Sequence, residues 1–118
     1  VLEQAASPGL GVCFDVYKAV STEQSVPEAI RGCGRLIANV HLSDFEPTDT
    51  TIGRLRCAIG SGAIDWAAVL RALREAGYDG PMILEMMGSG QDLETSRTYL
   101  EAVQARLSAD ALHTPETR

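Results

Sequence analysis

Three short apolar runs alternate along the chain with segments that have the features of helices. The runs cover residues 10–15, 35–42 and 81–86, and turn-forming glycine or proline precedes the first and the last of them. Their length and apolar character predict buried strands. Strands of this kind, alternating with amphipathic helices, are typical of a parallel sheet covered by helices. The sequence therefore predicts an α/β fold.

Helix-start signals and apolar periodicity define three predicted helices. In the run Ser25-Val26-Pro27-Glu28, the serine can cap a helix, the glutamate can bond back to it, and proline fits the first turn. This helix is expected to end near residues 32–34. Further helices are predicted at 66–76, after Asp65 as the cap, and at 92–107. The residues expected to face the core are Trp66, Val69, Leu70 and Leu73 in the second helix, and Leu93, Tyr99, Leu100, Val103 and Leu107 in the third.

The segments between these elements have less regular patterns. Residues 1–6 are predicted as the end of a helix, residues 16–24 as a loop, and residues 108–118 as a polar tail. A second predicted loop, residues 43–64, has no helical period and is long for a compact domain. Loops of this length are usually functional.

Composition argues against several classes of function. The 118 residues include 45% hydrophobic and 22% charged residues, which is ordinary for one small globular domain. A net charge of −6 argues against a nucleic-acid surface, and no apolar run reaches the about 18 residues that a membrane span needs. Three cysteines without a C-x-x-C motif predict a reducing, cytoplasmic setting without disulfides.

Each predicted strand has one potential metal ligand near its carboxyl end: Asp15, His41 and Glu85. Parallel strands of a βα array open their carboxyl ends on one face, so the three side chains are expected to meet. An aspartate in a turn and a histidine on an apolar strand both have ordinary structural roles. A structural role explains Glu85 less readily, because burying a carboxylate in the apolar run PMILEM costs free energy unless the carboxylate has a partner or binds a metal. Together they predict a site for Mn²⁺ or Mg²⁺, with Zn²⁺ or Co²⁺ as alternatives.

Four motifs in order carry a resemblance to a known family. They are GVCFD at 11–15, NVHLSD at 39–44, IGSGAIDW at 59–66 and AGYDGPMILE at 76–85. Together they resemble the xylose-isomerase-like sugar isomerases and epimerases, over about residues 1–105. The resemblance implies a partial (β/α)8 TIM barrel, its sixth to eighth strands, with residues 1–107 in the barrel domain. A whole barrel needs roughly 250 residues, so we expect the chain to be the C-terminal part of a longer protein.

The resemblance also implies roles for individual residues. Asp15, His41 and Glu85 become metal ligands, with a further glutamate ligand upstream, and Glu85 also transfers a proton through a metal-held enediolate. The ligand is a small sugar or sugar phosphate. Homo-oligomers are expected on separate grounds, because three βα units cannot close a barrel and leave a sheet edge unpaired. Arg56 resembles an arginine that contacts substrate oxygens, its alternative being a solvated cation. Lys18 stands where the family commonly has histidine, which makes it a substrate-facing or solvated cation.

Other functions remain open on the sequence. An apurinic endonuclease shares the fold and the metal chemistry, although Lys18 and the acidic charge weigh against it. An inosose-type dehydratase uses similar ligands. A non-catalytic barrel fragment is the third alternative, and the 118-residue chain by itself is expected to be inactive. Asp44, three residues after His41, is expected to form hydrogen bonds near the site rather than bind the metal.

Overall fold

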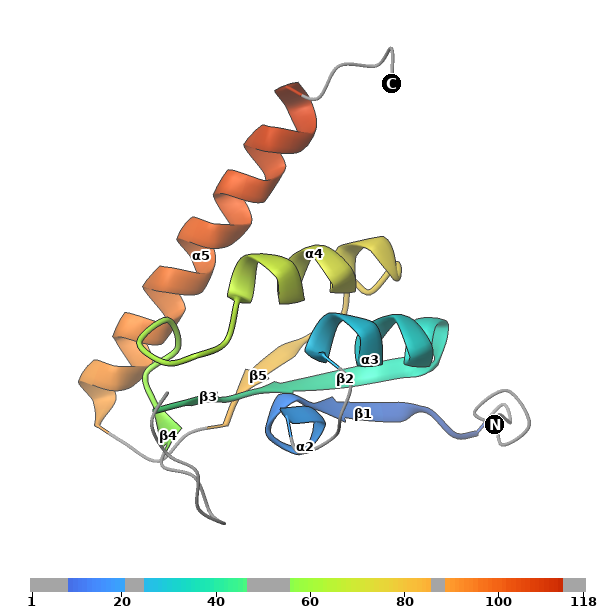
Figure 1. Cartoon of the computed structure of the whole chain (residues 1–118), viewed down its shortest axis with the longest axis horizontal. Helices are drawn as coiled ribbons and strands as arrows, with labels where there is room; N and C mark the ends of the chain where they lie inside the picture. Colours follow the sequence, from blue (N-terminus) through green and yellow to red (C-terminus); the bar gives the residue numbers. More distant parts are fainter. Residues whose placement is uncertain (1–8, 21–24, 47–55, 86–88, 114–118) are drawn as a thin grey trace.

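The structure, a computed structural model, describes residues 9–20, 25–46, 56–85 and 89–113. Strands and helices alternate, as the sequence predicts, and a 3-10 turn and a short hairpin are added (Figure 1). The predicted helix at 1–6 lies outside the described residues. In chain order the elements are β1 (Val12–Asp15), α2 (Val16–Val20), α3 (Val26–Cys33), a 3-10 turn (Gly34–Leu36), β2 (Ile37–Leu42), β3 (Asp44–Phe45), β4 (Arg56–Cys57), α4 (Trp66–Glu75), β5 (Met82–Leu84) and α5 (Gly90–His113).

The three predicted strands form one parallel sheet with the order β1-β2-β5. The register pairs Asp15 with His41 and Leu42 with Leu84, so the carboxyl ends of the strands lie at one edge. β3 continues the direction of β2 and pairs antiparallel with β4 (Figure 1). The predicted α/β class, with parallel strands, is confirmed.

The two faces of the sheet have different surroundings. One face packs against α3 and α4, and its residues Phe14, Val40 and Leu42 are 5%, 0% and 1% exposed. On the other face Cys13 is exposed and Ile83 is 44% exposed. β1 and β5 are the two edges of this sheet. The sheet therefore has one covered face and one open face, and both of its lateral edges lack a further strand among the described residues.

Two of the three predicted helix starts are confirmed in detail. Ser25 and Glu28 form a reciprocal capping box at the start of α3, with proline in the first turn. Asp65 caps α4 by accepting a hydrogen bond from the Ala68 amide at 3.2 Å. The predicted core residues of α4 are all buried. Gly77, with φ +83°, follows the end of this helix in the conformation that glycine adopts most readily.

One predicted loop begins with a helix instead. Residues 16–20 of the predicted loop 16–24 form α2, while residues 21–24 lie outside the described part of the chain. The cause lies at the end of β1, where Asp15 Oδ1 accepts a hydrogen bond from the Tyr17 amide at 2.8 Å. Aspartate at this position satisfies an amide of the first turn, and so a helix can start directly after the strand.

The last helix is longer than predicted and buries a different residue near its start. The Asp92 amide donates to Ser89 Oγ and the Ser89 amide to Asp92 Oδ2, which moves the start to Gly90. No glycine or proline interrupts residues 108–113, so the helix continues to residue 113. Leu93 is 45% exposed, so its predicted place in the core is wrong.

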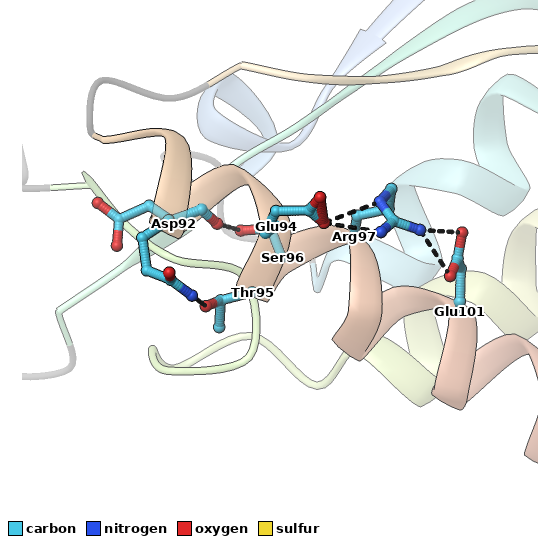
Figure 2. Close-up of polar contacts among 7 residues, drawn as sticks. Asp92, Glu94, Thr95, Ser96, Arg97 and Glu101 are labelled. Atoms are coloured by element: carbon cyan, nitrogen blue, oxygen red, sulfur yellow. Dashed lines mark hydrogen bonds and ion pairs between the residues drawn. The ribbon is translucent and has the colours of Figure 1, made fainter.

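Ser96 is the fully buried residue of this region, and Val103 and Leu107 continue the buried stripe. The Ser96 hydroxyl donates to the Asp92 carbonyl oxygen at 2.7 Å (Figure 2). On the outer surface of α5, Arg97 bridges Glu94 and Glu101 through exposed ion pairs. Exposed pairs of this kind contribute little to stability. No helix within the described ranges has both the length and the apolar character to cross a membrane.

Candidate metal centre

Asp15, His41 and Glu85 come together at the carboxyl edge of the parallel sheet. One ligand atom from each lies within 4.8 Å of the others, and all three side chains are partly buried. The predicted convergence of these residues is therefore confirmed. Two carboxylates and one imidazole at this spacing form a donor set that suits a divalent cation.

Backbone pairing explains why the three side chains converge. Asp15 and His41 are direct partners in the β1–β2 register. Glu85 follows β5, and its amide donates to the Leu42 carbonyl oxygen at 2.9 Å, which extends the pairing by one residue. Alternate residues of a strand point to opposite faces. The three side chains therefore share the open face of the sheet, beside Ile83 and Cys13 rather than with the packed residues.

Hydrogen bonds hold each of the three residues. His41 Nδ1 lies 2.7 Å from Glu85 Oε2, which links the imidazole to the second carboxylate. Asp15 Oδ1 accepts from the Tyr17 amide. Ser43, which is fully buried, donates its hydroxyl hydrogen to the Glu85 carbonyl oxygen at 2.8 Å. Hydrogen bonds from both side chains and backbone therefore hold the three residues in place.

The two predicted substrate-binding residues lie on elements that follow β1 and precede α4. Lys18 is exposed on α2, three residues after Asp15. Arg56 begins β4, and its backbone pairs with Phe45 of β3. Tyr17 and Phe45 stack edge to face, with ring centroids 5.1 Å apart, so α2 and β3 are in contact at this end of the sheet.

The sequence did not single out Ser43 or Ser96. Ser43 stands between His41 and Asp44 in the HLSD run, and its place two residues after a candidate ligand is the sequence signal that could have identified it. Asp44 was expected to form hydrogen bonds near the site. Its carboxylate is fully buried and accepts hydrogen bonds from the loop before α4 and from Trp66, the first residue of that helix. Asp44 is not part of the three-residue cluster.

The cysteines form no part of this cluster. Cys13, Cys33 and Cys57 are free thiols. Burial raises the pKa of Cys57, and the carboxylates of Asp44 and Glu46 raise it further. Burial also raises the pKa of Cys33. A raised pKa keeps a thiol protonated and less nucleophilic at neutral pH.

Comparisons with known proteins agree with this architecture. The family described as xylose isomerase-like TIM barrel matches residues 1–107. A ketose 3-epimerase from Arthrobacter globiformis is 27% identical over 88 residues, which cover 75% of this chain and 27% of that protein. A 3-dehydroshikimate dehydratase from Pseudomonas putida is 31% identical over 130 aligned positions, covering 98% of this chain and 20% of that protein. The chain thus spans only a fifth to about a quarter of these two relatives.

A solved structure shows the same fold. The structure of an L-ribulose 3-epimerase superposes with a TM-score of 0.69 at 20% identity, covering 97% of this chain and 43% of that chain. The three-stranded parallel sheet, with helices on one face and an open opposite face, is part of such a barrel. The match of the family to residues 1–107 and this superposition agree, and the chain belongs to the xylose isomerase-like TIM barrel family.

Proposed function

We propose that Asp15, His41 and Glu85 belong to the divalent-metal site of a sugar isomerase or epimerase that acts on a ketose or ketose phosphate. The observation that carries this proposal is their convergence within 4.8 Å at the carboxyl edge of the sheet. In barrel enzymes this edge carries the active site. The similarity to a ketose 3-epimerase supports the sugar as substrate class.

The donor set fits Mn²⁺ or Mg²⁺ best, because two of the three ligands are carboxylates, and Zn²⁺ or Co²⁺ are the alternatives. When bound, such a cation polarises a carbonyl oxygen and acidifies the neighbouring C–H bond. His41 Nδ1 and Glu85 Oε2 lie 2.7 Å apart, so two of the three side chains that would hold such a cation are adjacent.

Residues of this chain would transfer the proton, position the base and bind the sugar. Glu85 is the general base, which takes the proton from the carbon beside the carbonyl and can return it. Ser43 holds the Glu85 backbone, and His41 orients its carboxylate through the 2.7 Å contact. Lys18 and Arg56 bind oxygen atoms of the sugar or its phosphate.

Metal titration of the 118-residue chain tests this assignment. Mn²⁺ binding followed by electron paramagnetic resonance should show one site, and Asp15→Asn, His41→Ala and Glu85→Gln should each weaken it at least tenfold. Asp79→Asn removes an exposed carboxylate from the turn before β5 and serves as the matched control. Equal Mn²⁺ affinity in the parent and all three site variants would remove the basis for the proposal.

A dehydratase is the second candidate, favoured by the similarity to a 3-dehydroshikimate dehydratase. The same proton removal by Glu85 would then be followed by loss of a hydroxyl group rather than by return of the proton. Solvent deuterium in recovered ketose indicates isomerase or epimerase chemistry, whereas an unsaturated product that has lost water indicates the dehydratase. Cleavage of an abasic-site duplex without either product would support the nuclease alternative.

A further inference from the structure

We propose that Asp44 is a positioning residue that holds the 59–66 loop, and with it the strand that begins at Arg56, against the carboxyl end of β2. The functional part of this inference rests on the proposed function, because it assigns the loop to substrate binding. The three metal-site residues are held by other contacts. Loss of the Asp44 carboxylate is therefore expected to weaken sugar binding and leave metal binding intact.

The carboxylate of Asp44 is fully buried and is surrounded by N–H donors. Oδ1 accepts from the amides of Phe45 and Ile64, at 2.9 and 3.3 Å. Oδ2 accepts from the amides of Gly60 and Gly62 and from Trp66 Nε1, at 2.9, 3.2 and 2.9 Å. A buried carboxylate is costly unless it is hydrogen-bonded in this way. Four of the five donors come from a single loop and the helix start that follows it.

The two glycines of the loop are explained by this arrangement. Gly62 approaches so closely that a Cβ atom there would overlap the Phe45 carbonyl oxygen and Asp44 Oδ1. Gly60 has φ +98°, and a Cβ atom there would lie 2.7 Å from the ring of Tyr99 on α5. The GSG sequence at 60–62 therefore lets the backbone wrap around a carboxylate on one side and fit against α5 on the other.

Further bonds connect the loop to its surroundings. The Ala63 amide donates to the Phe45 carbonyl oxygen at 3.1 Å, and the Ile59 amide to Ser96 Oγ at 2.9 Å. The β3–β4 hairpin pairs Asp44 with Cys57 and Phe45 with Arg56. Asp44 thus lies at the junction of the β2 end, the hairpin and the loop, and its carboxylate fixes all three relative to one another.

The metal-site residues use separate supports. His41 contacts Glu85, Ser43 bonds to the Glu85 carbonyl oxygen, and Asp15 accepts from an amide of α2. The 59–66 loop supplies no residue to this cluster. This separation is the reason to expect different consequences for the metal and for the sugar.

Asp44→Asn is the primary variant. The amide nitrogen of asparagine cannot accept, so either the two donors at Oδ1 or the three donors at Oδ2 lose their acceptor. Because both sets of bonds hold the same loop, loss of either set should loosen it, and amide exchange at Gly60, Gly62 and Ile64 should become at least tenfold faster. Trp66 is the single tryptophan of the chain, so its indole N–H resonance should move, while Mn²⁺ affinity should stay within about threefold of the parent.

Two further variants make the result specific. Asp65→Ala removes the cap of α4 at the end of the same loop, and should lower the melting temperature without moving the indole resonance or the exchange rates at Gly60 and Gly62. Gly62→Ala keeps the carboxylate but displaces the loop from it, so it should reproduce the loop changes of Asp44→Asn. If Asp44→Asn does not fold, Gly62→Ala decides the question.

The kinetic readout uses a protein in which this chain is joined to the rest of the barrel, with D-fructose and Mn²⁺, where Asp44→Asn should raise KM more than tenfold and change kcat less. The positioning role is overturned if loop exchange in the folded variants stays within threefold of the parent. It is also overturned if Asp44→Asn weakens Mn²⁺ binding as much as Asp15→Asn does. A complete barrel with normal Mn²⁺ binding and no turnover of ketoses contradicts the assigned sugar chemistry, and the exchange data then still decide whether Asp44 holds the loop.

Discussion

His41 Nδ1 lies 2.7 Å from Glu85 Oε2, although the two residues are 44 positions apart in the sequence. Their strands are neighbours in the parallel sheet, where His41 pairs with Ile83. The contact therefore depends on the β2–β5 pairing and on the extension of that pairing to the Glu85 amide. Within the candidate metal centre, His41 and Glu85 are thus joined by a direct side-chain contact, whereas Asp15 bonds to the Tyr17 amide.

Replacing Glu85 by glutamine tests its two proposed roles, as metal ligand and as general base, without changing the size of the side chain. Glu85→Gln keeps the size of the side chain but removes its charge and basicity, so Mn²⁺ binding should weaken. In a protein that contains the complete barrel, exchange of solvent deuterium into a ketose should fall by about 10²–10⁴-fold, the usual contribution of general-base catalysis. Mass spectrometry of recovered substrate measures this exchange. A variant that exchanges deuterium as fast as the parent would show that Glu85 is not the base.

Removing the Ser43 hydroxyl should loosen Glu85. Ser43→Ala leaves the partly buried Glu85 carbonyl oxygen without this donor, at a cost of about 1–3 kcal/mol in the free energy of unfolding. Urea denaturation measures the stability, and Mn²⁺ titration should show weaker binding. Ser61→Ala, which removes an exposed hydroxyl bonded to the Ala58 carbonyl oxygen, is the control. Equal losses in the two variants would argue against a special role for Ser43.

Ser96 should matter more for stability than its small size implies. Ser96→Ala leaves the buried Ile59 amide without its acceptor, so the free energy of unfolding should fall by about 1–3 kcal/mol. Thr95→Ala, at an exposed neighbouring position of α5, should change stability by less than about 0.5 kcal/mol. Chemical denaturation of both variants tests the difference. Equal losses in the free energy of unfolding would show that the hydrogen bond from the Ile59 amide contributes little to stability.

The isolated 118-residue chain should associate or aggregate. β1 and β5 are unpaired edges of the described sheet, and the open face exposes Ile83. Light scattering after size-exclusion chromatography should show species larger than a monomer. Ile83→Lys places a charge on the open face and should reduce this association. A monodisperse monomer with a sharp, cooperative melt would contradict the prediction.

The thiols should react in the order of their exposure and pKa. Cys13 is exposed, whereas burial raises the pKa of Cys33 and Cys57. A raised pKa lowers the thiolate fraction at a given pH, so alkylation of Cys33 and Cys57 should lag behind Cys13 at pH 8 and gain more as the pH rises. Peptide mass spectrometry after timed iodoacetamide treatment gives the three rates. Equal rates at pH 8 would show that burial does not protect the two thiols.

Local signals in the sequence accounted for much of the fold. The apolar runs located all three parallel strands, and the Ser25–Glu28 capping box and the Asp65 cap located two helix starts. The same signals were weaker at the ends of α5. Its start depends on Ser89, and its continuation past Leu107 crosses residues 108–113, which contain no glycine or proline to stop it.

The sequence by itself determined the alternation of strands and helices and the position of one ligand-type residue near each strand end, because short apolar runs and caps act locally. Only the tertiary structure decided which polar residues are buried and what they contact. Leu93 is exposed, whereas Ser96 is buried and its hydroxyl oxygen accepts a hydrogen bond from the Ile59 amide. Asp44 accepts hydrogen bonds from residues up to 22 positions away in the sequence. Such bonds depend on how the 59–66 loop folds back onto β2 rather than on any local sequence pattern.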